Sequence, residues 1–462
     1  MLFSKYRAEL RRLFALALPL AAAQAGTQLM SVVDIAILGR VGGRELAASG
    51  LGNAVFFAVS IFGMGMVLGI DPLISQALGA GDRVRARAVM WHGVWLAVAI
   101  SAVLTIPLVL GPFLFPLIGV QPELIEPATI YLLIRAAGLL PWYLFLVARA
   151  YLQAYHHTRP LLVSMIVANV FNLGAGILLV FGGGGLPGWC GPLRSIPAMG
   201  VAGAALATVA GQILQLAIVA GAVRKIELPD RTQVSHRWNQ AGVMQAFQVG
   251  WPVALQMSAE VGIFALVALM AGRLGTLALA AHQLVISFAS FTFTVALGVA
   301  AAGSVRVGLA VGARDQEATK IAGHTAFIGG VVVMSAGALL FITMPRLLAR
   351  VITDVPAVIE AAAPLFFVAA FFQISDGIQA VGAGVLRGAA DTKFAFLANL
   401  IGHWLVGFPV ALLLGFGLKM GIVGLWWGFV AGLSVVAGLL FIRFERLSSA
   451  PIAPVGPVRT SA

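Results

Sequence analysis

The chain has 462 residues, of which 60% are hydrophobic and 10% are charged, and its mean hydropathy is +1.00. This composition excludes an ordinary soluble domain and indicates a polytopic membrane protein. The formal net charge of +12 would suit a nucleic-acid-binding protein, but the basic residues are spread over alternate loops, which argues against that class.

Apolar segments long enough to cross a bilayer as helices follow one another along the chain, and we count twelve. The first begins with basic residues and superficially resembles a secretory signal, but its apolar character continues to Leu38, so we interpret it as a membrane helix. The fold class is therefore predicted to be all-α, with twelve transmembrane helices in two six-helix bundles. The predicted spans are 13–38, 47–75, 88–110, 128–148, 160–182, 198–223, 241–271, 278–303, 321–344, 358–386, 394–416 and 420–442.

The basic residues predict the orientation of these spans. Most of the 29 Lys and Arg residues lie in the N-terminal segment, in alternate loops and in the C-terminal segment. The positive-inside rule then places both termini in the cytoplasm, and an even number of spans requires both on one side. The single cysteine, Cys190, excludes an intramolecular disulfide.

The two halves of the sequence repeat each other. Pro19–Asp82 can be laid without a gap on Pro252–Asp315, at an offset of 233 residues. A fainter repeat follows, and a glycine-rich loop around residues 182–197 forms an insertion in the first half. Because six helices separate equivalent positions, both copies enter the membrane in the same direction. We therefore expect a pseudo-two-fold axis along the membrane normal.

A polar stretch, Arg224–Gln240, divides the two repeats. It predicts an N-terminal bundle over residues 1–223, a cytoplasmic linker over 224–240, a C-terminal bundle over 241–443 and a cytoplasmic tail over 444–462.

Three acidic residues fall well inside predicted spans: Asp34, Glu260 and Asp376. An ionised carboxylate at bilayer depth costs about 3 kcal/mol on insertion scales, so each must be protonated, paired or exposed to a wet cavity. The acids also break the repeat, since Asp34 aligns with Val267 and Glu260 with Thr27. They are therefore the first candidates for function, and Glu260 and Asp376 could share one cation or one proton.

Other residues in or near the spans have two interpretations each. Phe372 precedes Asp376 by one helical turn and could offer an aromatic face to a bound cation, or it could pack against lipid or a neighbouring helix. Arg135 could extend toward the interface or neutralise a nearby acid. Asp71 is interpreted as a solvated acid at the end of the second span.

Several motifs together resemble the multidrug and toxic compound extrusion (MATE) family, in particular its NorM-type bacterial branch. The resemblance covers about Leu13 to Arg443 and rests on the order and spacing of the motifs. They are the Pro19-to-Asp34 helix ending in Gly39-Arg40, Gln76-Ala77-Leu78-Gly79-Ala80-Gly81, Ala280-Ala281-His282-Gln283, Asp376-Gly377-Ile378-Gln379, Leu386–Lys393 and His403–Pro409.

The resemblance implies an exporter of organic cations driven by Na⁺ or H⁺, with no cofactor other than the coupling ion. Glu260 and Asp376 match the cation-site acids and would be the metal ligands if the ion is Na⁺, and Asp34 matches the acid of the first helix. Asn172 and Gln283 are candidates for a secondary polar site. The family often shows Asn followed four residues later by Asn or Asp, whereas here Gly176 lies four residues after Asn172. This difference argues against a proton site in the N-terminal half and favours Glu260 and Asp376 as the coupling site.

The expected protein is a monomer in the bacterial inner membrane that binds cationic amphiphiles, does not bind nucleic acid and is not an enzyme. One alternative is a lipid-linked oligosaccharide flippase of the same superfamily, which would need a strongly basic cavity. The spans offer only Arg135 and, at the edge of a span, Arg306 for that purpose. Two further alternatives are a membrane-embedded enzyme and a passive channel. The enzyme would need a nucleophile or a metal cluster, and the channel would show flux without ion coupling.

Overall fold

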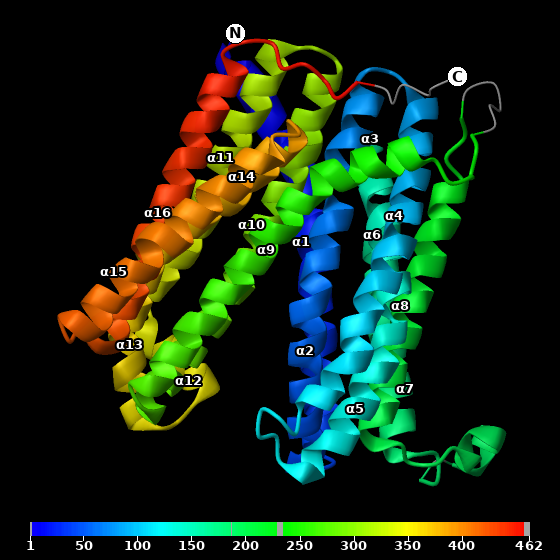
Figure 1. Ribbon diagram of the computed structural model, residues 1–462, viewed down its shortest axis with the longest axis vertical. Helices are drawn as coiled ribbons and strands as arrows, with labels where there is room; N and C mark the ends of the chain where they lie inside the picture. The colour runs from blue at the N-terminus through cyan, green and yellow to red at the C-terminus, as the bar shows by residue number, and fades with distance from the viewer. Residues whose placement is uncertain (1, 186, 229–233, 457–462) are drawn as a thin grey trace. The chain divides into compact units, whose positions relative to one another are not determined.

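The computed structural model describes residues 2–185, 187–228 and 234–456, and every regular element among them is helical (Figure 1). Within these residues, twelve segments are long and apolar enough to cross a membrane. The prediction of an all-α, multi-pass membrane protein with twelve spans is therefore confirmed. The helices are α1 (Leu2–Gly39), α2 (Gly43–Leu68), α3 (Ile70–Gly79), α4 (Arg83–Leu110), η1 (Gly111–Leu114), α5 (Pro122–Ala137), α6 (Leu139–Ala154), α7 (Arg159–Phe181), η2 (Gly188–Ser195), α8 (Gly200–Arg224), α9 (Gln240–Arg273), α10 (Thr276–Gly312), α11 (Gln316–Thr343), α12 (Pro345–Ile352), α13 (Pro356–Gly388), α14 (Thr392–Asn399), η4 (Leu400–Gly407), α15 (Phe408–Leu412), η5 (Leu413–Gly417) and α16 (Gly421–Ser448).

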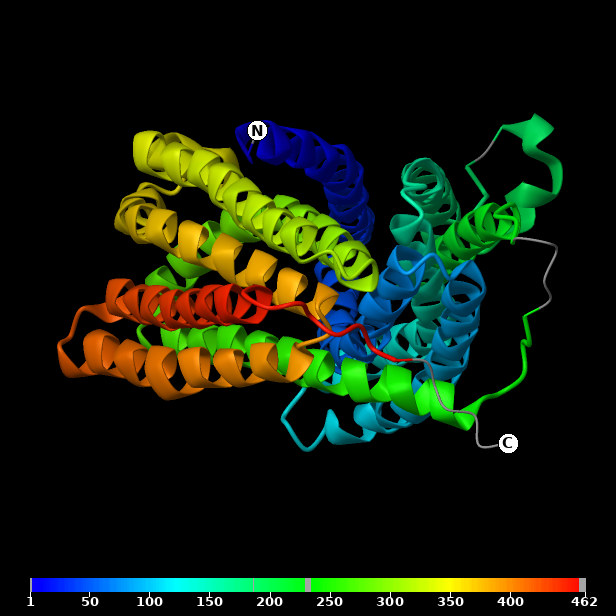
Figure 2. The ribbon, with the colours of Figure 1, turned by 90° about the horizontal axis from the view of Figure 1, so that it is seen from above.

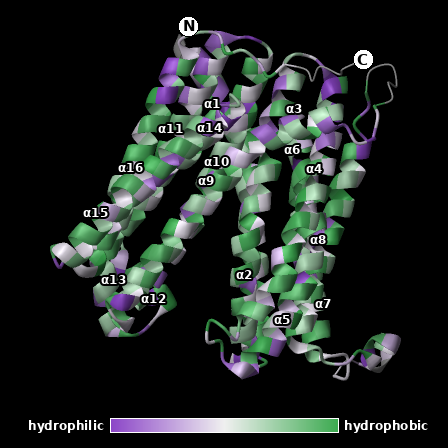
Figure 3. Cartoon of the chain, viewed as in Figure 1, coloured by the Kyte–Doolittle hydropathy of each residue, from purple (hydrophilic) through white to green (hydrophobic). Residues whose placement is uncertain are grey.

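Some spans consist of more than one helix. The second span joins α2 to α3, the fourth joins α5 to α6, and the eleventh runs from α14 to η5. In the eleventh span, η4 and η5 are π-helical. Figure 3 shows apolar residues along the lengths of the helices and hydrophilic residues gathered near their ends. This pattern is typical of helices whose sides face lipid or one another.

The described chain folds into two compact units. The first unit contains the described residues of Met1–Gln24, Asp71–Ala86 and Gln248–Pro457, and the second contains those of Ala25–Ile70 and Arg87–Phe247. Each unit thus takes most of one repeat, but the first also takes the start of α1, all but the first residue of α3 and the start of α4. The predicted domain limits stay a prediction, and residues 229–233 of the linker and 457–462 of the tail lie outside the described residues.

The first unit is built around α13. This helix packs against α10, α11 and α16, and Figures 1 and 2 show these helices side by side. Its core contains large buried side chains from several helices, among them Phe366, Phe372 and Trp426. In the second unit, α8 packs against α5, α6 and α7, and α2 packs against α5.

The repeat seen in the sequence is also present in the turns. The turn after α3 has Gly81 at φ +78°, and the turn after α10 has Arg314, its equivalent, at φ +56°. Asp82 and Asp315 follow, and each side chain accepts a hydrogen bond from the backbone N–H three residues later, at 2.8 and 2.9 Å. A left-handed residue at the end of one helix followed by an acidic cap on the next explains why this stretch repeats without a gap.

Candidate functional site

Glu260 is held by two side-chain amides in the first unit. Its Oε2 accepts a hydrogen bond from Gln379 Nε2 at 3.3 Å and one from Asn399 Nδ2 at 3.4 Å. The three residues come from α9, α13 and α14, respectively. From the sequence, neither amide residue was proposed for this site, and Gln379 was named only as part of a motif.

Asp376 lies on α13 three residues before Gln379, and therefore on the same face of that helix. Its side chain is buried, with 3% of the residue exposed, and the charge of Glu260 acts on its carboxyl. The structure thus brings together the two acids that the sequence analysis paired, although 116 positions separate them in the sequence.

Two amide oxygens at this site have no hydrogen-bond partner among the described residues: Gln379 Oε1 and Asn399 Oδ1. A side-chain amide offers both donors and an acceptor. Its N–H groups suit an ionised Glu260, whereas its oxygen suits a protonated carboxyl or a small hard cation. Carboxylate and amide oxygens therefore fit either Na⁺ or H⁺. No group of three or more His, Cys, Asp or Glu suited to a metal ion occurs among the described residues, so a cation here would draw on amide oxygens as well.

The structure places Phe372 beside this site but inside an aromatic cluster. Its ring lies edge-on to Trp426, Phe429 and Phe264, with centroids 5.4, 5.9 and 6.2 Å away. Of the two interpretations of Phe372, packing is the one with contacts in this structure, and contact with a bound cation stays a prediction. Gln283, on α10, is exposed, and the structure does not bring it into contact with the acids.

A second polar site lies in the second unit. Thr208 Oγ1, on α8, donates a hydrogen bond of 2.7 Å to Asp34 Oδ2. Asn172, on α7, has its Nδ2 3.5 Å from the same hydroxyl. Asp34 Oδ1 and Asn172 Oδ1 have no partner among the described residues. Two of the predicted residues therefore meet through Thr208, which the sequence analysis missed.

Arg135 lies near this second site. It is 8% exposed, its guanidinium lies 4.3 Å from the centre of the Phe56 ring, and its charge acts on Asp34. Of the two interpretations of Arg135, partial neutralisation of a nearby acid fits the structure, and extension toward the interface does not.

The interpretation of Asp71 as a solvated acid is wrong. Asp71 is 8% exposed, and its Oδ2 lies 3.9 Å from Nε of Arg387 at the end of α13. Asp71 is buried because nearly all of α3 packs within the first unit, where Arg387 from the other repeat faces Asp71. The attraction between two buried opposite charges offsets part of the cost of removing them from water.

The comparisons with known proteins agree with this architecture. The sequence matches the MatE family over residues 19–178 and 252–413, two blocks that begin at the equivalent prolines of the repeat. A probable multidrug resistance protein NorM of Rhizobium meliloti (strain 1021) is 34% identical over 453 residues, covering 95% of this chain and 94% of the relative. A protein of the same description from Mesorhizobium japonicum is 36% identical over 454 residues, covering 96% and 94%.

Solved structures share the fold at low identity. The crystal structure of the eukaryotic MATE transporter AtDTX14 has a TM-score of 0.84 and 20% identity, covering 96% of this chain and 98% of that one. A MOP superfamily transporter from Pyrococcus furiosus has a TM-score of 0.84 and 18% identity, with 96% of each chain covered. The chain belongs to the MatE family, as the motifs predicted, and is a transporter rather than an enzyme.

Proposed function

We propose that this protein is a secondary active antiporter that exports organic cations in exchange for Na⁺ or H⁺ by alternating access. The observation that carries the proposal is the paired site of Glu260 and Asp376, with amide groups able to serve a carboxylate, a carboxylic acid or a cation. The relatives described as multidrug resistance proteins support cationic amphiphilic drugs as the substrate class.

Coupling follows from unequal binding of the ion to the two states of the transporter. When Glu260 and Asp376 are both ionised, they repel each other, and Na⁺ or H⁺ at the site removes that repulsion. The state that holds the acids together is therefore favoured when the ion is bound. The coupling ion then lowers the affinity for the exported cation by favouring one arrangement of the helices.

The membrane is proposed to be the bacterial inner membrane, with a monomer as the functional unit. The start of α1 and the end of α16 lie at the same end of the first unit, because Tyr6 and Glu445 both bond His324. Together with the distribution of basic residues, this supports cytoplasmic positions for both termini. No cofactor besides the coupling ion is proposed.

The test is efflux of a fluorescent organic cation from proteoliposomes, driven by an imposed Na⁺ gradient or, separately, by an imposed pH gradient. Drive by Na⁺ alone would make Glu260 and Asp376 a sodium site, and drive by pH alone would make them a proton site. Drive by neither would contradict the antiporter and favour the flippase. That alternative gains little from the basic residues of the spans, because Arg306 is bound to Glu9 at 2.6 and 2.7 Å.

A further inference from the structure

The chain beyond α16 is bound by two side chains from the other repeat. The backbone N–H of Val455 donates to Gln76 Oε1 at 2.8 Å. Arg85 Nη2 donates to the carbonyl oxygens of Val455 and Gly456, at 2.5 and 2.8 Å. Gln76 lies on α3 and Arg85 on the first turn of α4, so this segment contacts both sides of the α3–α4 turn (Figures 1 and 2). We call residues 449–456 the C-terminal strap.

Gln76 also links the strap to the core of the first unit. It is 2% exposed, and its Nε2 donates to the carbonyl oxygen of Gly388, the last residue of α13, at 3.0 Å. Its oxygen and its nitrogen thus bind the strap and α13 at once. A buried amide with both ends satisfied fixes the position of its partners, because breaking either bond leaves a buried polar group unpaired.

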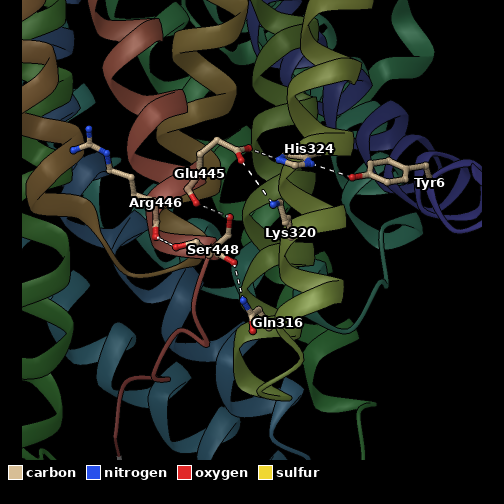
Figure 4. Close-up of polar contacts among 8 residues, drawn as sticks. Tyr6, Gln316, Lys320, His324, Glu445, Arg446 and Ser448 are labelled. Atoms are coloured by element: carbon tan, nitrogen blue, oxygen red, sulfur yellow. Dashed lines mark hydrogen bonds and ion pairs between the residues drawn. The ribbon is translucent and has the colours of Figure 1, made fainter. Parts of the chain in front are cut away.

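The first residue of the strap follows the end of α16, which is bound to α11 (Figure 4). Gln316 Nε2, on α11, donates to the carbonyl oxygen of Ser448 at 3.3 Å. One turn earlier, Glu445 bonds His324 and lies 4.0 Å from Lys320 Nζ, both on α11. The last turn of α16 is therefore held on α11 before the strap begins.

Between these two anchors the strap is short and stiff. Six residues, 449–454, separate Ser448 from Val455, and they include Pro451 and Pro454. Six extended residues span at most about 20 Å, and proline restricts the backbone further. The length of the strap therefore limits how far the α3–α4 turn can move from the end of α16 while the contacts at Val455 stay in place.

We propose that the C-terminal strap is a latch that holds the α3–α4 turn in the first unit and that opens during the transport cycle. The chain leaves the first unit at Ala86, one residue after Arg85, so the latch acts where the chain passes from one unit to the other. Alternating access requires helices of the two repeats to change their arrangement. Because the strap stabilises one arrangement of the helices, it slows the conversion of that arrangement into the other. This regulation rests on the proposed transport function.

The latch is tested first by hydrogen–deuterium exchange of the full-length protein in detergent or nanodiscs, which does not depend on transport. Val455→Pro removes the N–H that binds Gln76, and Val455→Ala keeps it. Arg85→Met removes the donor to the two carbonyls, and Arg83→Met removes the same charge from an exposed residue two positions away. The first member of each pair should speed exchange in the peptides covering residues 70–90. We expect a change of about two- to tenfold for Val455→Pro, which loses one neutral hydrogen bond, and of at least about tenfold for Arg85→Met, which loses charge-assisted bonds. Its control should leave exchange unchanged.

Transport by the same four proteins tests the regulatory role. Val455→Pro and Arg85→Met should raise the rate of substrate efflux at saturating gradient by about two- to fivefold if release of the latch limits turnover. Unchanged exchange in both variants would overturn the latch itself. Faster exchange with unchanged efflux would overturn its role in the cycle and leave a static brace. Absence of efflux by the wild-type protein would count against the proposed function, while the exchange data would still judge the latch.

Discussion

Gly79 and Gly312 occupy equivalent positions of the two repeats, and each faces the backbone of the helix that carries the other. A Cβ added to Gly79 would overlap the carbonyl oxygen of Leu309, and one added to Gly312 would overlap that of Gln76. Gln76 and Leu309 are themselves equivalent at the offset of 233 residues. The crossing of α3 and α10 is therefore self-complementary, as the local symmetry of a duplicated chain requires.

Gly312→Ala should destabilise the protein because there is no room for a methyl group at this crossing. The expected cost is about 1–3 kcal/mol, the range for overpacking a close contact. Gly221→Ala is the matched control, because Gly221 lies on α8 with no atom within 4 Å of an added Cβ. Thermal unfolding in detergent checks the pair, and an equal melting temperature for both variants would contradict the close approach.

Glu260→Gln and Asp376→Asn should each abolish ion-driven export while leaving a folded protein in the membrane. Both substitutions remove the charge that an ion would neutralise and keep the approximate shape of the side chain. Glu360→Gln is the control, since Glu360 is an exposed acid on α13, bound to Arg346 at 2.9 Å. Efflux from proteoliposomes at equal protein content is the measurement, and normal export by both site variants would refute the assignment of the acids.

Thr208→Val should destabilise the second unit through Asp34. The substitution keeps the size of the side chain but removes the hydroxyl that donates to Oδ2, and loss of a partner for a buried polar group costs about 1–3 kcal/mol. Thr325→Val is the control, because the hydroxyl of Thr325 donates only to a carbonyl of its own helix, at 2.6 Å. In a protein that already carries Asp34→Asn, Thr208→Val should cause a smaller loss of stability than it does in the wild-type protein. A cost independent of the residue at position 34 would show that the two side chains are not coupled.

Arg387→Met and Asp71→Asn should each be strongly destabilising, by about 3–5 kcal/mol, because each leaves the opposite charge buried with less compensation. The double variant should be more stable than the sum of the single effects predicts. Thermal unfolding of the four proteins in a double-mutant cycle gives the coupling energy. Simple additivity would mean that the 3.9 Å approach of the two side chains contributes nothing.

The spans, the repeat and the three buried acids could be predicted because each leaves a local signal. Twenty apolar residues are visible in any window, and a carboxyl such as Asp34 stands out against them. Uncharged polar residues such as Thr208 and Asn399 carry a much smaller insertion cost and occur often in membrane helices, so nothing in their own segments marks them. Gln379 had a weak signal, since it lies one turn after Asp376 in a motif that the sequence analysis used.

Asp71 was misinterpreted for a different reason. Its partner, Arg387, lies in the other repeat, and pairing across such a separation depends on which helices pack together. Position near the end of a span predicts solvation only when no other helix covers that end.

The division of the chain into units does not follow the division into repeats. Glu9, Gln76 and Gly79 come from the first half of the sequence but contact residues on α10 and α13. A protein cut within residues 224–240 would therefore give a second fragment that lacks Glu9 and Gln76, which contact Arg306, Gly312 and Gly388. Neither fragment carries a complete set of buried contacts, so activity should return only when both are made in the same membrane and assemble there. The two halves of the sequence repeat each other, but the first unit takes segments from both halves, so neither half forms a complete unit alone.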